Sequence, residues 1–234
     1  MCGRLNVIDD PGVRELCEGL QIQLFPESQI FSRFIRATNQ VSIGRQKDGV
    51  RRMDNATWWL LLEPSTTGFK PSKYTSFNTR YDKLNVKGSA GYQAYRHSRC
   101  VIPAKGFGET EYVNNKPLHY HDMVAKDGAI LLGGLCREWI NKDTGETALS
   151  CSVITIPPHP KLMHIHTKAS PLLMPLNTEL VDRWLDESIT DPIEFEPLLQ
   201  PHIPYDLLAI QIDKPSTYKA MNNESSLISH DVAN

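Results

Sequence analysis

Short stretches in which apolar and polar residues alternate dominate the chain. Each stretch is bounded by Gly, Pro, Asn or Asp, and together these features predict β-strands. The predicted strands cover residues 40–45, 57–62, 98–103, 117–124, 129–135 and 148–156, with a late strand at 207–212.

Helical patterns are fewer. Residues 10–20 predict a helix, with Asp10 as N-cap, Pro11 in the first turn and a glycine near the end. Residues 177–186 and 195–199 also have helical character. Many short strands with a few helices predict an α+β fold, built on a curled, mostly antiparallel, barrel-like sheet with flanking helices.

The organisation of the chain predicts one compact domain over residues 1–234, because no internal repeat or low-complexity linker interrupts it. Residues 222–234 are a candidate flexible tail. Hydrophobic residues make up 40% and charged residues 22% of the 234 residues, a balance typical of globular proteins. No apolar stretch approaches the roughly 20 residues that a membrane-spanning helix needs.

The N-terminal residues Met-Cys-Gly-Arg-Leu-Asn lack the apolar core of a signal peptide, so a cytoplasmic location is expected. The five cysteines are odd in number and show no Cys-x-x-Cys spacing. We therefore expect neither a disulfide framework nor a structural zinc site, and no cofactor.

Charge is unevenly distributed although the net charge is only −2. Residues 33–105 contain fourteen Lys and Arg against four Asp and Glu, whereas residues 171–234 contain three basic against eleven acidic residues. A basic region of this size favours contact with nucleic-acid phosphates, and the acidic region would confine DNA to one side. The alternative is that folding interleaves the two regions and their fields cancel.

Cys2 is the first candidate for chemistry. Removal of Met1, which is usual before a small second residue, would leave Cys2 with a free α-amine beside its thiol. Such an aminothiol condenses with an aldehyde to a Schiff base, and the thiol then closes a thiazolidine ring. The amine pKa of about 7.7–8.0 leaves a useful neutral fraction at cytoplasmic pH. The alternative is a frayed terminus without function.

Four motifs follow one another along the chain. They are Met-Cys-Gly-Arg at the start, Asn-Thr-Arg-x-Asp at residues 78–82, Arg-Cys-Val-Ile-Pro-Ala-x-Gly-Phe-x-Glu at 99–109 and Ile-His-Thr-Lys at 165–168. This ordered set resembles the SRAP (SOS response-associated peptidase) family of abasic site processing proteins. Residues 34–45, 56–60 and 213–227 resemble further family segments, so the resemblance covers nearly the whole chain.

The resemblance implies recognition of abasic sites in single-stranded DNA and a covalent thiazolidine crosslink that shields the lesion. Cys2 would be the nucleophile, and Asn78 would hydrogen-bond the α-amine or the opened sugar. Glu109 would donate and accept protons, and His166 would protonate the sugar oxygen to open the ring. An abasic sugar is mostly a closed hemiacetal, so ring opening and loss of water both need acid catalysis.

DNA contacts are implied as well. Arg4 and Arg80 lie at family positions that bind backbone phosphates, because a guanidinium pairs bidentately with such oxygens. Trp58 and Trp59 are candidates for stacking on bases. The alternative for the tryptophans is core packing, which we expect for one of the two.

Other interpretations of the site residues exist. Asn78 could be a turn residue, and Glu109 could be a solvated acid beside Glu111. The histidines of the pairs His119–His121 and His164–His166 are two residues apart, so on a strand both members of a pair would face the same side and could bind a metal ion. No carboxylate or cysteine at a suitable spacing completes a ligand set, so we expect no metal.

The chain departs from the family at several positions. The family usually has Asp at the position of Lys105, aromatic residues at Gly108 and Thr110, and Arg-Met-Pro at residues 169–171, where this chain has Ala-Ser-Pro. The missing arginine weakens one support of the site, with Lys168 as the candidate replacement. We expect capture to be retained, with an altered DNA grip or reversal rate.

Three functions compete at this point. The first is covalent abasic-site capture with weak lyase chemistry, since a Schiff base also permits β-elimination. The second is an N-terminal-nucleophile cysteine peptidase that could release its own Met1. The third is a non-enzymatic single-strand binding module, and a metal-dependent cupin-like enzyme is more remote. A protein bound alone at a lesion gives no reason to expect more than a monomer.

Overall fold

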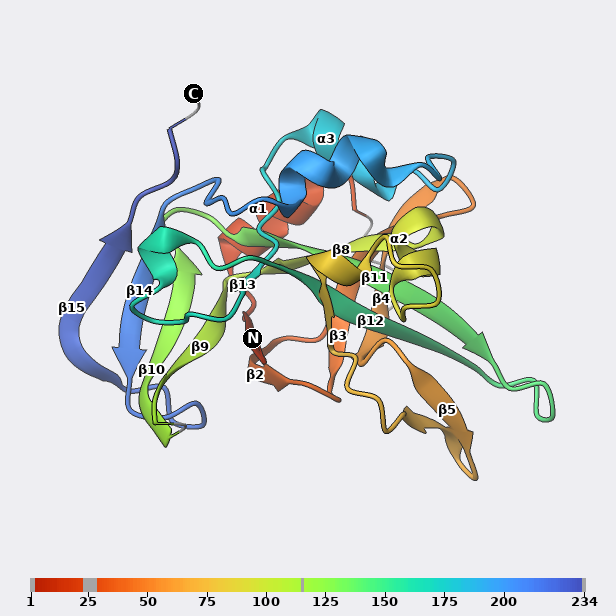
Figure 1. Ribbon diagram of the computed structural model, residues 1–234, viewed down its shortest axis with the longest axis horizontal. Coiled ribbons are helices and arrows are strands. Elements are labelled where there is room, and N and C mark those ends of the chain that lie inside the picture. Colours follow the sequence, from red (N-terminus) through yellow and green to blue (C-terminus); the bar gives the residue numbers. More distant parts are fainter. Residues whose placement is uncertain (1–2, 23–28, 115, 233–234) are drawn as a thin grey trace.

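The computed structural model describes residues 3–22, 29–114 and 116–232. It confirms the α+β class, with two curled sheets and a few helices (Figure 1). The first sheet is antiparallel throughout and has six strands. In spatial order they are β15 (Ala220–Ile228), β14 (Leu207–Ile212), β10 (Lys116–Ala125), β9 (Gly106–Val113), β1 (Arg4–Val7) and β2 (Ser32–Arg36).

The second sheet closes on itself. Its ring is formed by β11 (Ile130–Ile140), β8 (Arg99–Ala104), β3 (Gln40–Lys47), β4 (Val50–Trp58) and β12 (Thr147–Ile156), with β11 also paired to β12. β13 (Ser170–Pro171) and β7 (Asn78–Arg80) add to β12. β4 and β7 run parallel to β12, and the remaining pairs are antiparallel. A small separate hairpin consists of β5 (Leu62–Ser65) and β6 (Gly68–Pro71).

The helices gather on one side of the ring, away from the β5 hairpin (Figure 1). They are α1 (Pro11–Gly19), α2 (Tyr92–His97) and α3 (Thr178–Leu185). The structure also has the 3-10 turns η1 (Tyr81–Lys83), η2 (Pro160–Leu162) and η3 (Pro192–Leu199). Asp10 caps α1 by accepting a hydrogen bond from Gly12 N at 2.9 Å, as its sequence predicts. The helix at 177–186 is confirmed as α3, with Asn177 as its N-cap.

Two hydrophobic clusters make the core. One fills the ring and the space between the two sheets, and includes Trp58, Phe107 and Ile165. The other lies between the ring and the helices and includes Trp184 and Phe195. The first cluster is the one that positions the candidate site.

Arg99, the first residue of the third motif, has a structural task. Its side chain donates hydrogen bonds to the backbone oxygens of Tyr95, Trp184 and Asp186 at 2.6–2.8 Å. Carbonyls at helix C-termini lack intrahelical partners, so this buried guanidinium stabilises the ends of α2 and α3 against the ring.

Some predicted elements were wrong in detail. The strand expected at 57–62 does not exist as one element, because β4 ends at Trp58 and β5 begins at Leu62. The helix expected at 195–199 is part of the 3-10 segment η3, which contains Pro197. Residues 220–228, which overlap the candidate flexible tail, form β15 against β14.

Candidate active site

Glu109 lies near the middle of β9, on the face that carries Phe107 into the core. Its register places it opposite His121 of β10. Only 5% of Glu109 is exposed. Alternation along a strand explains this position, because residues 107 and 109 must share one face of the sheet.

His166 reaches the same point from the loop after η2. The loop is held by backbone bonds from His166 N to Leu162 O at 2.8 Å, and by the buried side chain of Ile165. The ring nitrogen Nδ1 of His166 lies 3.4 Å from Oε2 of Glu109. The third and fourth motifs therefore meet in space, although they are more than fifty residues apart in the sequence.

Burial shifts the two groups in opposite directions. Desolvation raises the pKa of Glu109 to about 7, although the nearby Arg4 charge opposes the shift. Burial also lowers the pKa of His166 to about 4. Both shifts favour neutral groups, as expected for ionisable side chains removed from water. At neutral pH the proton of this pair resides on the carboxyl, so Glu109 can donate or accept one near its own pKa.

The second motif borders the first core cluster, as this pair does. Asn78 begins β7, where it pairs with Val153 of β12. Phe77, directly before Asn78, packs on the cluster that also contains Phe107 and Ile165. The shared cluster thus connects the strand of Asn78 with the neighbours of Glu109 and His166.

Arg80 points to solvent from the end of β7. Its side chain is 62% exposed and forms a bidentate pair with Asp82 at 3.0 Å. Exposed pairs of this kind contribute about 0–1 kcal/mol, so the guanidinium can exchange Asp82 for another anion at little cost.

The two adjacent tryptophans differ. Trp58 is fully buried, and its Nε1 donates to the Phe77 backbone oxygen at 2.8 Å. A ring enclosed on all sides has no face for a base, so Trp58 is a core residue. Trp59 is partly exposed, with its ring centroid 5.8 Å from that of Phe77. Trp59 is therefore the remaining candidate for stacking.

Cys2, the proposed nucleophile, lies outside the described residues. The other four cysteines are buried as free thiols. Among the residues that the structure describes, no group of three or more His, Cys, Asp or Glu side chains is arranged to hold a metal ion. His119 instead pairs with Glu111 at 2.9 Å. No helix in residues 3–22, 29–114 and 116–232 is long and apolar enough to cross a membrane.

Comparison with known proteins identifies the family. The family model for the SOS response associated peptidase (SRAP) matches residues 1–215. The chain belongs to the SRAP family. It is 25% identical over 232 residues to the abasic site processing protein YoqW of Bacillus subtilis, covering 98% of this chain and 100% of YoqW.

Two further comparisons differ in extent. The abasic site processing protein HMCES of Xenopus tropicalis is 27% identical over 161 residues, which cover 61% of this chain and 48% of HMCES. A crystal structure of a Bacteroides thetaiotaomicron protein superposes with a TM-score of 0.72 at 18% identity, covering 94% of this chain and 95% of that one. This last likeness concerns the fold alone.

Gly108, an expected departure from the family pattern, leaves room for the Arg4 side chain. Gly108 pairs with Arg4, whose side chain lies across it, so a Cβ at residue 108 would come within 1.9 Å of Arg4 Nε. Arg4 uses this space to reach the buried Asp122, at 3.0 Å, and to donate to the His121 backbone oxygen at 2.8 Å. An aromatic side chain at 108 would exclude this arrangement.

Arg4 itself is only 7% exposed, and these contacts hold its guanidinium against β10. A sequence argument based on its family position did not anticipate Asp122. The signal was present, however, because an acidic residue inside the predicted strand 117–124 needs a partner if that strand is buried.

Residues at the other expected departures make local contacts. Lys105 lies between β8 and β9, and its Nζ donates to the Gly128 backbone oxygen at 2.8 Å. The same Nζ lies 3.5 Å from Oδ1 of Asp10, and this ion pair connects the start of α1 to the turn between the two strands. Ser170 Oγ accepts a hydrogen bond from His159 N at 3.3 Å. Lys168 is exposed, and its charge adds to the lowering of the His166 pKa.

Proposed function

We propose that this chain processes abasic sites in single-stranded DNA by forming a covalent thiazolidine link between Cys2 and the sugar aldehyde. The observation that carries the proposal is the buried Glu109–His166 pair, which offers one proton near pH 7 beside the start of β1. Membership of a family whose curated relatives are named abasic site processing proteins supports the same substrate.

Covalent geometry bounds where Cys2 can act. β1 begins at Arg4, which pairs with Gly108, the residue before Glu109. Two residues span at most about 7 Å. Whatever conformation residues 1 and 2 take, the backbone of Cys2 stays within that distance of the Arg4 Cα atom, and Arg4 is next to the strand that carries Glu109.

The proposed reaction needs no oxidant or cofactor. After Met1 is removed, the α-amine of Cys2 attacks C1′ of the open-chain aldehyde to give a carbinolamine, which loses water to form an imine. The Cys2 sulfur then adds to the same carbon, and the proton of the thiol goes to the nitrogen as the C=N double bond becomes single. One water is released in total.

Glu109 and His166 would transfer protons in this reaction, and Asn78 would bind the reactants. Glu109 gives a proton to the departing water and recovers it from the attacking amine, which its pKa near 7 permits. His166 relays a proton from Glu109 to the ring oxygen of the closed sugar and returns it on reversal. Asn78 would hold the amine or the opened sugar by hydrogen bonds.

The DNA grip is part of the proposal. Arg80 would exchange Asp82 for a backbone phosphate, and Trp59 would stack on a base next to the lesion. We propose that Arg4 acts mainly by fixing β1. A monomeric single domain in the cytoplasm, associated with the nucleoid when bound, fits this task, and weak lyase activity would follow from the imine.

The test is incubation of the purified protein with a uracil-containing single strand pretreated with uracil glycosylase. We expect a heat-stable shifted band on a denaturing gel with wild-type protein and none with Cys2→Ala. His166→Ala should slow both formation and reversal of the band.

Other outcomes select the competing functions. Cleavage of an amide substrate without a band would indicate the cysteine peptidase. A shift that disappears on heating and is unchanged in Cys2→Ala would indicate a non-covalent binding module. Either result overturns the proposal.

A further inference from the structure

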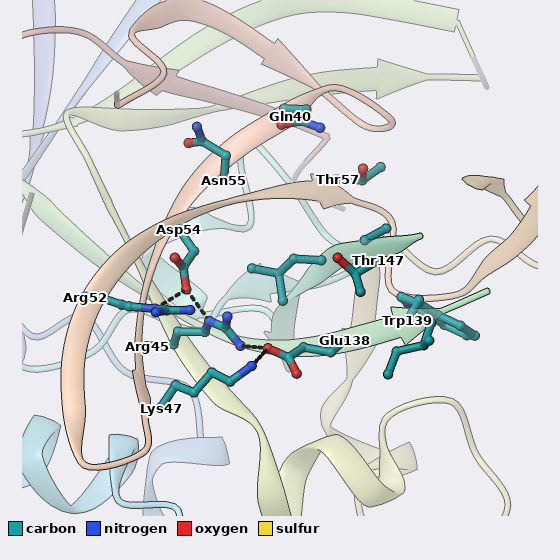
Figure 2. Close-up of a pocket in the computed structure, with 13 residues that line it drawn as sticks. Gln40, Arg45, Lys47, Arg52, Asp54, Asn55, Thr57, Glu138, Trp139 and Thr147 are labelled. Carbon is teal, nitrogen blue, oxygen red and sulfur yellow. Dashed lines mark hydrogen bonds and ion pairs between the residues drawn. The ribbon is translucent and has the colours of Figure 1, made fainter. Parts of the chain in front are cut away.

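A large polar cavity opens where β4 separates from β12. Figure 2 shows charged side chains from β3, β4 and β11 around it. Its volume is about 760 Å³. Neither Glu109 nor His166 lines it, so it is separate from the candidate active site.

One wall of the cavity contains a preformed anion site. Arg45 Nη1 lies 2.9 Å from Oε1 of Glu138, and Lys47 Nζ donates to the same oxygen. Two cationic donors from β3 therefore converge on a single carboxylate oxygen, the arrangement by which proteins also bind phosphate. In this structure the Glu138 carboxylate occupies that position (Figure 2).

The cationic side of the site is rigid. The Arg45 side chain is only 9% exposed, and its Nε is held by Asp54 at 2.5 Å. Asp54 also accepts from Arg52 Nε at 2.9 Å. Because Asp54 holds the Nε side of Arg45, the guanidinium keeps its orientation when the anion at Nη1 changes.

Another anion can replace the Glu138 carboxylate at this site. Glu138 lies near the end of β11, and its side chain is 46% exposed. A carboxylate that remains so close to water gains about 0–1 kcal/mol from an ion pair. When Glu138 rotates away, the cluster of Arg45, Lys47, Arg52 and Asp54 holds three positive charges against one negative charge.

The cavity lies along the same strand edge as Asn78. β4 pairs with β12 at residues 150–151, and β7 pairs with β12 in the same direction at residues 153–155. The cavity is lined by β12 residues 147–149, which lie about 13–20 Å from Val153, the partner of Asn78. Trp59, the residue after β4, contacts Phe77, the residue before β7.

We propose that Arg45 and Lys47 bind a backbone phosphate of the same DNA strand, several nucleotides away from the abasic sugar, in exchange for the Glu138 carboxylate. This inference rests on the proposed function, since it takes the strand held at Asn78 as its ligand. Glu138 thereby acts as an internal competitor that is displaced only when DNA extends along this edge.

Binding of undamaged single strands to Cys2→Ala protein tests the inference without the crosslink. Fluorescence anisotropy would compare a strand of about five nucleotides with one of about twenty, over a series of salt concentrations. Glu138→Gln should bind the long strand up to about fivefold more tightly, corresponding to the loss of a competitor worth up to about 1 kcal/mol. Lys47→Ala should reduce the slope of log affinity against log salt by about 0.7.

Matched controls come from the helical side of the molecule. Arg183 and Glu194 form an exposed ion pair between α3 and η3. Arg183→Ala and Glu194→Gln make the same charge changes far from this edge, and should have smaller effects.

Each remaining outcome decides between claims. Binding by the Cys2→Ala protein, with Glu138→Gln and Lys47→Ala no different from their controls, overturns the subsite alone. If Glu138→Gln tightens the binding of short and long strands equally, the subsite is overturned too, because the gain then comes from the changed net charge and not from a contact that only the long strand reaches. If inorganic phosphate raises the melting temperature through Lys47 but DNA binding is unaffected, the site belongs to a small anion. Absence of any single-strand binding overturns the proposed function together with this inference.

Discussion

His166 Nδ1 lies 3.4 Å from Glu109 Oε2, and burial moves the pKa values of the two groups in opposite directions. The acid becomes weaker and the base becomes weaker, so near pH 7 His166 is neutral and Glu109 is about half protonated. When Glu109 holds its proton the pair is uncharged, which suits a site that must protonate a sugar oxygen and then accept the proton back.

The first prediction concerns Glu109 and stability. The folded pKa of about 7 is above the ordinary value of 4.5, so the native state retains a proton that the unfolded state releases between these values. Wild-type stability should therefore fall as pH rises from 4.5 to 7, by about 3 kcal/mol in total. Glu109→Gln should remove this loss. Urea unfolding at pH 4.5 and pH 8 measures it, and an equal difference between the two proteins at both pH values would contradict it.

The second prediction concerns His166 and has the opposite sign. Its folded pKa of about 4 is below the ordinary 6.5, so the unfolded state gains a proton first as pH falls. His166 should lower wild-type stability as pH falls from 6.5 to 4, by about 3 kcal/mol. His166→Asn should abolish that dependence. Thermal unfolding across this range tests it, and the prediction fails if the two proteins lose stability in parallel.

The third prediction concerns Gly108. In Gly108→Ala the new Cβ would meet the Arg4 guanidinium at about 2 Å, and Arg4 must then leave Asp122, which is 1% exposed. Loss of the partner of a buried charge costs about 3–5 kcal/mol, but Arg33, 3.6 Å from Asp122, would remain and offset part of this cost. We therefore expect the free energy of unfolding to fall by an amount toward the lower end of that range. A useful control is Gly19→Ala, where no atom lies within 4 Å of the added Cβ. Equal effects at the two glycines would show that Arg4 does not depend on residue 108.

The fourth prediction separates the two tryptophans. Trp58→Ala should destabilise the fold by about 3–5 kcal/mol, because the ring is fully buried. Trp59→Ala should cost less stability and weaken binding of single-stranded DNA by about 1–3 kcal/mol, the usual contribution of one stacked base. Denaturant unfolding and anisotropy measure the two effects. DNA affinity unchanged in Trp59→Ala would remove Trp59 from the interface.

Sequence patterns predicted elements well where one face of a strand is buried. The strand at 207–212 is β14 with the same bounds, and the helix at 10–20 is α1 to within one residue at each end. The segment 57–62 shows the limit. Trp58, Leu60 and Leu62 are all buried, so the alternation was real, but Leu60 N bonds to Ser76 O instead of extending a strand. Alternation reports burial, and only partners in space determine pairing.

β4 and β9 were not predicted, and the reasons are physical. β9 contains Gly106 and Gly108, which have low strand propensity but allow close approach of residues from the neighbouring strands β10 and β1. β4 carries Arg52 and Asp54 on its inward face at the mouth of the ring, where charges replace the expected apolar residues.

The candidate site was only partly accessible from sequence. The motifs located Glu109 and His166, and the structure brings them together. The ion pairs Arg4–Asp122 and Arg45–Glu138 each join residues that are far apart in the sequence, so they could not be predicted without the fold.

The central claim is a covalent link through the N-terminal cysteine, and the intact mass of the product tests it most directly. Wild-type protein incubated with a single strand that contains one abasic site should give one adduct. Its mass should equal the protein without Met1 plus the oligonucleotide minus one water, and Cys2→Ala should give no adduct. An adduct that retains Met1, an adduct that persists in Cys2→Ala, or no adduct with wild type would contradict the account.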